Sequence, residues 1–410
     1  MTDQLQGQEL FPFKREAGHP FDLPSDLTRR REEEPVSRVP IWDGSTPWLV
    51  TRHADVKSVL SDPRVSMNYL TPGMPPENPF IKVRRQKEAR ESSGLSMDGA
   101  LHAQLRRVLT PLFTVKRLSK LRPKIQQIAD ELIDNMLAGP KPVDFVESFA
   151  RPLPMLVICE LLGVRYEDRE MFKESAERMM MTSTTEAESM ELITKVHAYF
   201  GELAELRKRE PGDDVFSALV ERMEAGDITL DHVKSLAVVL VIAGHDTTVN
   251  MIAMSTLALF DNPEQLAELR ANTEDPVLVA NAVEEMLRYL TLTHIGRRRA
   301  IIEDIEIDGK VMRKGEGVIC AENAANRDPA VFPNPEQIDF HQEQTREHLA
   351  FGYGVHQCIG QQLARFELQA AFSTLHRRIP TLQFAGSSLD SLPYKDEFIV
   401  YGVDSFPVTW

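Results

Sequence analysis

A cysteine in a glycine-rich segment is the residue of this sequence whose setting most clearly indicates chemistry. Residues 351–365 read FGYGVHQCIGQQLAR, so Cys358 stands just before an amphipathic stretch that predicts a helix. Because a helix N-terminus carries partial positive charge, this position is expected to lower the thiol pKa and favour the thiolate. The segment therefore predicts a metal ligand.

The residues around this cysteine suggest what the metal belongs to. Gly354 and Gly360 let the backbone pass close to a bulky, flat group, and Phe351 would cover it. A buried structural cysteine in a glycine-rich turn is the alternative for a lone cysteine. The many fixed positions of the spacing, Phe-x-x-Gly-x-His-x-Cys-x-Gly-x-x-Leu-Ala-Arg, favour the metal ligand.

A second polar cluster interrupts the apolar stretch 236–260. Residues 243–248 read AGHDTT, and Thr247 follows Ala243 by four positions. A hydroxyl at this spacing can bond to the carbonyl one turn back, bend a helix and leave room for a ligand or water. A polar packing defect in a core helix is the alternative. Since a charged turn at a bilayer centre is costly, we expect a buried helix and no membrane span.

The composition of the chain excludes some classes of protein. The chain has 410 residues, with 47 Lys and Arg against 62 Asp and Glu, and a formal net charge of −15. This balance argues against a nucleic-acid binder. Three scattered cysteines, at 159, 320 and 358, exclude a disulfide framework and suit a reducing compartment. With no signal-peptide pattern at the amino terminus, we expect a cytoplasmic protein.

The elements that must position these residues are mostly helices. We expect one domain over residues 1–410: a short β region near 38–52, a helical bulk over 100–290, and a part over 291–410 that contains strands and the cysteine segment. Thr229 predicts the N-cap of a helix of about thirty residues that ends near 261–263.

The cysteine segment resembles the haem-binding loop of the cytochrome P450 family, in which the cysteine thiolate is the proximal iron ligand. Glu285 and Arg288 resemble the family's Glu-x-x-Arg motif, and Arg327 resembles the third member of its buried structural network. The resemblance covers nearly the whole chain. It implies a mainly α fold with a minor β part, in which a long central helix lies over a buried haem.

The resemblance assigns roles to the remaining polar residues. Residues 243–248 are similar to the family's oxygen-binding segment, in which Asp246 and Thr247 would deliver protons to bound dioxygen. The cofactor implied is haem b, iron protoporphyrin IX. Arg299 matches the arginine with which the family binds a haem propionate from a strand. The adjacent Arg297 and Arg298 leave open which of the three arginines takes this role. The residues expected to bind haem are Cys358, His102, Arg106, Arg299, His356, Phe351, Gly352 and Gly360.

The function implied is that of an actinobacterial-type haem-thiolate monooxygenase, which inserts one atom of dioxygen into a hydrophobic small molecule by hydroxylation or epoxidation. The substrate would be a secondary metabolite or a foreign compound. Electrons would come from a separate ferredoxin and ferredoxin reductase, because the chain carries no flavin or nicotinamide fingerprint. Two alternatives stay open: oxidative ring closure or coupling without net oxygen insertion, and a non-catalytic haem sensor or carrier.

Substrate contacts are expected from a loop, from the long helix and from segments near the carboxyl terminus. Most of these residues are apolar, which predicts a hydrophobic substrate. They are Met67, Leu70, Met180, Val239, Ala243, Ile295 and Phe398. Local positive charge for the ferredoxin is expected from Arg107, Lys116, Arg117, Arg365, Arg377 and Arg378.

Overall fold

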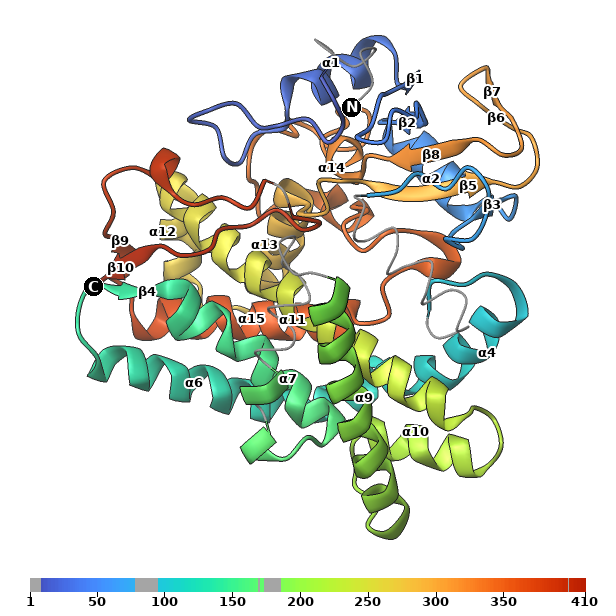
Figure 1. Cartoon of the computed structure of the whole chain (residues 1–410). Helices are drawn as coiled ribbons and strands as arrows, with labels where there is room; N and C mark the ends of the chain where they lie inside the picture. Colours follow the sequence, from blue (N-terminus) through green and yellow to red (C-terminus); the bar gives the residue numbers. More distant parts are fainter. Residues whose placement is uncertain (1–8, 78–94, 169, 173–185, 397) are drawn as a thin grey trace.

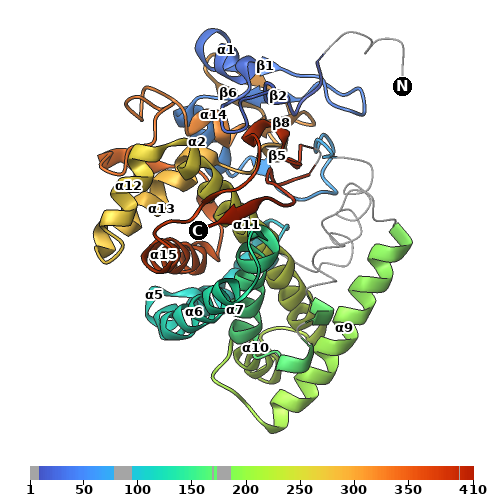
Figure 2. The same ribbon diagram turned by 90° about the vertical axis from the view of Figure 1, so that its left-hand side faces the viewer.

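The computed structural model describes residues 9–77, 95–168, 170–172, 186–396 and 398–410 (Figure 1). Met180 lies outside these residues. In Figures 1 and 2, a mixed region of strands and short helices lies at one end, and the long helices fill the other. The fold is mainly helical with a minor β part, as predicted.

The helices range from four-residue elements such as α5 and α14 to the 32-residue α11. They are α1 (Ser25–Glu33), α2 (His53–Ser61), α4 (Gly99–Leu109), α5 (Val115–Leu118), α6 (Arg122–Ala138), α7 (Pro152–Leu162), α9 (Glu186–Arg209), α10 (Val215–Glu224), α11 (Leu230–Asp261), α12 (Pro263–Ala271), α13 (Pro276–Leu290), α14 (Glu322–Ala325) and α15 (Gln361–Arg378).

The strands form one five-stranded sheet and two smaller sheets. The strands are β1 (Val36–Arg38), β2 (Trp48–Val50), β3 (Val65–Ser66), β4 (Val143–Asp144), β5 (Arg297–Ile301), β6 (Ile305–Ile307), β7 (Lys310–Met312), β8 (Gly317–Cys320), β9 (Gln383–Phe384) and β10 (Pro407–Thr409). The large sheet has the order β1-β2-β8-β5-β3. The hairpin expected near 38–52 is present, although its first strand begins two residues earlier, at Val36.

The carboxyl-terminal strand returns to the helical region. β10 pairs on one side with β9 and on the other with β4, which lies more than 260 residues earlier in the chain. β6 and β7 form a separate two-stranded ribbon. The strands predicted within residues 291–410 are therefore confirmed, and the last strand of the chain pairs with a strand of the helical region.

The central helix α11 has the boundaries that its sequence predicts. The Thr229 hydroxyl accepts a hydrogen bond from the His232 backbone, and the His232 ring accepts one from the Thr229 backbone, which together form a capping box. Asn262 and Pro263 end the helix. α11 contacts α7, α9, α10, α13 and α15, so it is the element around which the helical region is assembled.

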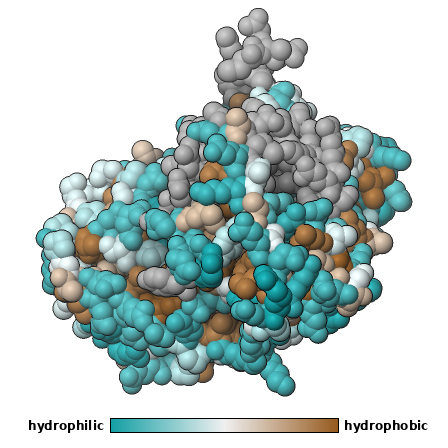
Figure 3. Space-filling view, turned by 60° about the horizontal axis from the view of Figure 1, so that its bottom comes forward, coloured by the Kyte–Doolittle hydropathy of each residue, from teal (hydrophilic) through white to brown (hydrophobic). Residues whose placement is uncertain are grey.

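The interior accounts for the apolar character of α11. It is the one described helix long and apolar enough to span a membrane, but 67% of its most apolar window is buried inside the protein. Its neighbours contribute a continuous core that includes Phe145, Phe149 and Phe216. The face of the molecule in Figure 3 is mostly hydrophilic, with hydrophobic residues in small separate groups. The helix is therefore a core element, as expected.

Candidate active site

The Cys358 segment is an irregular loop that leads directly into α15. The Cys358 backbone N–H donates to the Phe351 carbonyl at 2.9 Å, which closes the loop. Gly352 and Gly354 have φ of 73° and 75°, a conformation that side chains other than glycine rarely adopt. A β-carbon on Gly354 would lie 2.6 Å from the Leu60 carbonyl oxygen. Gly354 is thus required by contact with the end of α2.

The direction in which the pKa of the Cys358 thiol shifts differs from the sequence prediction. Burial raises the pKa of the thiol, whereas the nearby Arg297, Arg106 and Arg365 and the Gly360 backbone act in the opposite direction. The expectation that the helix N-terminus lowers the pKa is wrong, because burial outweighs it. A bound metal ion would supply the missing positive charge, since metal coordination deprotonates a thiol.

Two histidines lie beside this loop. The rings of His102 on α4 and His356 are 4.2 Å apart, and His356 Nε2 lies 2.9 Å from the carboxylate of Asp98. Arg106 donates to the Gln357 carbonyl at 3.1 Å. Burial, and then the charges of His356 and Arg106, lower the pKa of His102 to about 4. The structure therefore brings His102 and Arg106 of α4 beside His356 and Gln357, which lie about 250 positions later in the chain.

Strand β5 contributes two further arginines, Arg297 and Arg299. Arg297 pairs with the buried Glu322, and a β-carbon on Gly352 would lie 2.9 Å from Arg297 Nε. Arg299, two residues along and so on the same face of the strand, is buried. Within the described residues its one hydrogen bond runs to the Arg298 carbonyl. Sequence reasoning chose Arg299 and left Arg297 and Arg298 as alternatives for its register; strand alternation places Arg297 on the same face as Arg299.

One face of α11 is open in the middle of an otherwise buried helix. Ala243 and Thr247 are exposed, and Val239, one turn earlier, is half-buried. The Thr247 hydroxyl donates to the Ala243 carbonyl at 2.7 Å, as the spacing predicted. The adjacent Asp246 points elsewhere and is buried. Burial raises the pKa of its carboxyl, whereas the charges of Lys395 and Arg151 lower it.

These residues fit a thiolate-ligated group with an anionic edge. Arg299 is buried, and an anion bound to its guanidinium would offset the cost of removing that charge from water. A β-carbon on Gly360 would contact only the Cys358 sulfur, at 3.9 Å, so the backbone leaves space beside the thiol. A soft sulfur donor surrounded by cations suits iron in an anionic porphyrin.

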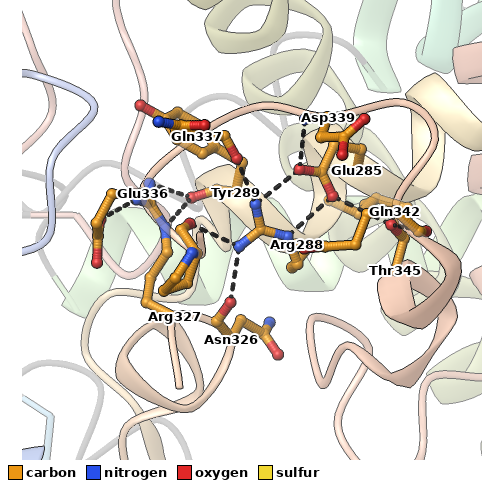
Figure 4. Close-up of polar contacts among 12 residues, drawn as sticks. Glu285, Arg288, Tyr289, Asn326, Arg327, Glu336, Gln337, Asp339, Gln342 and Thr345 are labelled. Carbon is orange, nitrogen blue, oxygen red and sulfur yellow. Dashed lines mark hydrogen bonds and ion pairs between the residues drawn. The ribbon is translucent and has the colours of Figure 1, made fainter. Parts of the chain in front are cut away.

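Figure 4 shows the buried network around Glu285 and Arg288 of α13. Arg288 donates from Nε and Nη2 to the Glu285 carboxylate at 2.9 and 2.7 Å, and both side chains are 0% exposed. Arg288 also donates to the carbonyls of Asn326, Pro335 and Gln337. This pair therefore fastens α13 to the chain that precedes the cysteine loop.

Arg327 is connected to α13 by hydrogen bonds to backbone carbonyls. It donates to the Tyr289 carbonyl at 2.8 and 3.1 Å and to the Phe21 carbonyl, and it pairs with Glu336. Its guanidinium also lies 3.8 Å from the Tyr289 ring centroid. Arg327 thus holds the carboxyl end of the helix that carries Glu285 and Arg288, which fits the structural role predicted for it.

A neighbouring carboxylate, Glu284, was missed by sequence reasoning. It accepts two hydrogen bonds from Arg365 of α15, at 2.6 and 2.9 Å, and lies 3.1 Å from His348 Nε2. Arg365 also lies over the Phe351 ring at 4.7 Å. Arg365 is therefore engaged inside the protein, which weakens its assignment to an exposed basic surface.

The residues expected to contact substrate lie in varied settings. Ile295 is buried, Met67 and Phe398 are half-buried, and Leu70 is 42% exposed. The Met67 N–H donates to the carboxylate of Asp98, the residue that also meets His356. The Phe398 carbonyl meets the ring of His294. Together with Val239 and Ala243 they stay candidates for the pocket, while Met180 lies outside the described residues.

Comparison with known proteins identifies the class. Residues 180–379 match the family model described as Cytochrome P450. The chain is 48% identical over 409 residues to the cytochrome P450 GfsF of Streptomyces halstedii, covering 100% of this chain and 98% of that protein. It is 37% identical to the 20-oxo-5-O-mycaminosyltylactone 23-monooxygenase of Streptomyces fradiae, covering 100% and 94%.

Solved structures agree with this class. The crystal structure of GfsF superposes with a TM-score of 0.90 and covers 98% of this chain and 100% of that one. The mycinamicin VIII C21 methyl hydroxylase MycCI of Micromonospora griseorubida, bound to mycinamicin VIII, is 34% identical, with a TM-score of 0.85 and coverage of 98% and 100%.

The chain therefore belongs to the cytochrome P450 family of haem-containing monooxygenases. Such enzymes use dioxygen, a small-molecule substrate and redox partner proteins.

The Glu285–Arg288 pair generates a stability prediction. Arg288→Met leaves a buried carboxylate without its partner and is expected to lower the free energy of unfolding by about 3–5 kcal/mol. The control Arg313→Met removes the exposed ion pair with Asp304 and should lower the free energy of unfolding far less. Urea denaturation of both variants checks this. Equal losses would show that the buried pair has no special weight.

Glu284 generates a pH prediction. Burial alone would raise the pKa of its carboxyl, but the hydrogen bonds from His348 and Arg365 outweigh burial and lower the pKa to about 2. The ionised form therefore contributes roughly 3 kcal/mol of stability above pH 4.5, and this is lost as the pH falls towards 2.

Urea denaturation at a series of pH values measures this contribution. Glu284→Gln is expected to be less stable than the unmodified protein at pH 7, and the difference should shrink below pH 4.5. A difference that stays constant with pH would contradict the assignment.

Proposed function

We propose that this enzyme inserts one oxygen atom from dioxygen into a hydrophobic secondary metabolite, by hydroxylation or epoxidation. The observation that carries the proposal is the combination of Cys358, in a loop lined by cations, with an open Thr247 and a buried Asp246 on the central helix. An enzyme that never activates dioxygen would not need this acid and alcohol. The carrier alternative is therefore less well supported.

Haem b would be held by residues from three parts of the chain, which are α4, β5 and the cysteine loop. Cys358 would ligate the iron, and His102, Arg106, Arg299 and His356 would bind the propionates. Phe351, Gly352 and Gly360 would line the ring on the cysteine side. Bound haem with a thiolate ligand supplies dioxygen activation, because the thiolate donates electron density that favours O–O cleavage.

Arg297 is added to this set by its contacts. It approaches Gly352 in the cysteine loop and pairs with Glu322, which keeps its guanidinium in place. A cation there stabilises the thiolate of Cys358 against the cost of burial.

Thr247 and Asp246 would manage protons. The Thr247 hydroxyl donates to the Ala243 carbonyl, and this bond holds the hydroxyl oxygen on the open face of α11. Asp246 is one residue away and buried, so it can hold a proton apart from substrate and bulk water. The acid would resupply the proton that the alcohol passes on.

The substrate class proposed first is a macrolactone or a related polyketide. Two similar proteins bear names of such substrates, a mycaminosyltylactone and mycinamicin VIII. The pocket residues proposed are mostly apolar and come from distant parts of the chain, which suits a large hydrophobic molecule. They are Met67, Leu70, Met180, Val239, Ala243, Ile295 and Phe398.

Electrons would come from a ferredoxin and its reductase in the cytoplasm, with residues 1–410 acting as one haem-binding domain. Arg107 and Lys116 are exposed near the cysteine side and would attract an acidic partner. Arg378 is a weaker candidate, because it pairs with Asp130 and Asp134.

The test is an optical titration of the ferric protein against macrolactones, other polyketides, terpenoids and steroids, followed by turnover under ¹⁸O₂. We expect a high-spin shift with one class and a product that gains one labelled oxygen. A product that loses two hydrogens without gaining oxygen would favour ring closure or coupling. No haem spectrum at all would overturn the proposal.

A substitution at Thr247 tests the oxygen chemistry. Thr247→Ala is expected to release more of the consumed oxygen as peroxide and to lower product yield about tenfold or more, because proton delivery is disrupted. Thr256→Ala, on the same helix two turns later, also loses a bond to a carbonyl and serves as control. Product and peroxide measured together decide. An unchanged ratio in Thr247→Ala would contradict the role.

A further inference from the structure

Asp98 occupies the position at which a helix is normally capped, but its side chain binds other partners. It directly precedes α4 with an extended backbone, and among the described residues its carboxylate accepts no hydrogen bond from the first turn of that helix. Aspartate at this position usually accepts from the second or third N–H of the helix. Asp214 does so at the start of α10, where it accepts from the Ser217 N–H at 2.6 Å. The carboxylate of Asp98 therefore serves another contact.

This carboxylate binds a short segment of the chain that lies 30 to 32 residues earlier. It accepts hydrogen bonds from the Ser66 hydroxyl, from the Met67 N–H at 3.1 Å and from the Asn68 N–H at 3.2 Å. An ionised carboxylate has enough lone pairs for all three donors, and hydrogen bonds to a charged acceptor are stronger than neutral ones. Asp98 therefore holds segment 66–68 through three successive residues.

The same segment begins a turn that carries proposed substrate contacts. The Ser66 hydroxyl accepts from the Asn68 N–H at 3.1 Å, and Asn68 Oδ1 accepts from the Leu70 N–H at 2.9 Å. Met67 and Leu70 are two of the residues proposed to contact substrate. They therefore belong to a hydrogen-bonded turn that is bound to the rest of the protein by Asp98.

On its other side, Asp98 meets the cysteine loop. Its Oδ1 lies 2.9 Å from His356 Nε2. Burial would raise the pKa of the Asp98 carboxyl, but hydrogen bonds from His356 and Ser66 outweigh burial and hold the pKa well below its usual range. Because an ionised carboxylate can only accept, Nε2 carries the hydrogen of this bond. Asp98 therefore fixes the orientation of the His356 ring, which is proposed to bind a haem propionate.

Asp98 also lies close to the other two parts of the chain that would hold haem. Ser66 ends β3 and pairs with Ala300 of β5, which is next to Arg299. α4 begins directly after Asp98. The carboxylate is therefore placed where segment 66–68 meets α4, β5 and the cysteine loop.

We propose that Asp98 is a positioning residue for substrate recognition, whose carboxylate holds segment 66–68, and with it Met67, at a fixed place relative to His356 and the haem edge. The inference rests on the proposed function, in which Met67 contacts substrate and His356 binds a propionate. Loss of the carboxylate releases the segment from the haem edge. Binding of a large ligand then weakens, whereas access of a small ligand to the iron stays the same.

A purely structural anchor for the start of α4 is the competing explanation. Such an anchor would stabilise the protein, and its loss would not distinguish a large ligand from a small one. Two nitrogen ligands of haem iron make this distinction. Imidazole contacts the iron and its immediate surroundings, whereas econazole is an imidazole whose aromatic groups extend into the pocket.

The test is an optical titration of the ferric, haem-loaded protein with imidazole and with econazole. Asp98→Ala is expected to raise the Kd of econazole about tenfold and to leave the Kd of imidazole unchanged, because the charge-assisted hydrogen bonds to segment 66–68 are lost. Asp98→Asn keeps an oxygen acceptor without the charge and should give an intermediate Kd for econazole. An unchanged Kd of econazole in Asp98→Ala, or an equal rise for imidazole, would overturn the proposal.

A double-mutant cycle tests whether Asp98 acts through the segment. Ser66→Ala removes one of the three bonds and should also raise the Kd of econazole, so it tests the proposal even where Asp98→Ala folds poorly. Added to Asp98→Ala, it should change the Kd far less than it does alone, because its bond to the carboxylate is already lost. Fully additive effects would contradict the positioning role.

Asp214→Ala is the matched control, because it also removes an aspartate at the start of a helix. It should lower stability in urea and leave the Kd values of both imidazoles unchanged. A rise in the Kd of econazole equal to that in Asp98→Ala would show a general effect of stability and leave only the structural anchor.

Turnover separates this proposal from the proposed function. With a substrate that is oxidised, Asp98→Ala should raise KM more than it lowers kcat, and an unchanged KM would contradict the positioning role. If the unmodified enzyme oxygenates none of the compounds tested, the proposed function fails. The two Kd values still decide the role of Asp98, because their measurement needs no substrate.

Discussion

The rest of the structure depends on one buried ion pair, Glu285 with Arg288. Both charges are fully removed from water. The free-energy cost of this burial is offset because the guanidinium donates to the carboxylate and to three backbone carbonyls. Those carbonyls belong to the chain that leads to the cysteine loop. The pair thus fixes the position of residues 326–337, a segment that contains no strand or helix of its own.

The adjacent residue of the same helix extends this control to the other end of the loop. Glu284 binds Arg365 in the first turns of α15 and meets His348 just before Phe351. Successive side chains of a helix point about 100° apart, so Glu284 and Glu285 reach different segments. Two carboxylates of α13 therefore hold both sides of the loop in which Cys358 lies.

Sequence predicted what local spacing determines. The boundaries of α11 followed from Thr229 and Pro263, and the bond from Thr247 to Ala243 followed from a spacing of four. Glu284, Arg297 and Lys395 have partners that lie 81, 25 and 145 residues away in the sequence. No local spacing predicts contacts over such separations. The lowered pKa expected for Cys358 failed for a related reason: helix position is visible in the sequence, whereas the degree of burial is set by the whole fold.

The two central residues of α11 divide the proposed work because they lie on different faces of the helix. Thr247 is on the open face with Ala243, where a substrate and dioxygen can approach. Asp246 is turned into the protein, where Asn250 shares its surroundings and the charges of Lys395 and Arg151 act on it. A proton donor placed on the open face would exchange directly with whatever water the substrate leaves behind. On the buried face, the proposed acid Asp246 is kept apart from the water beside the substrate.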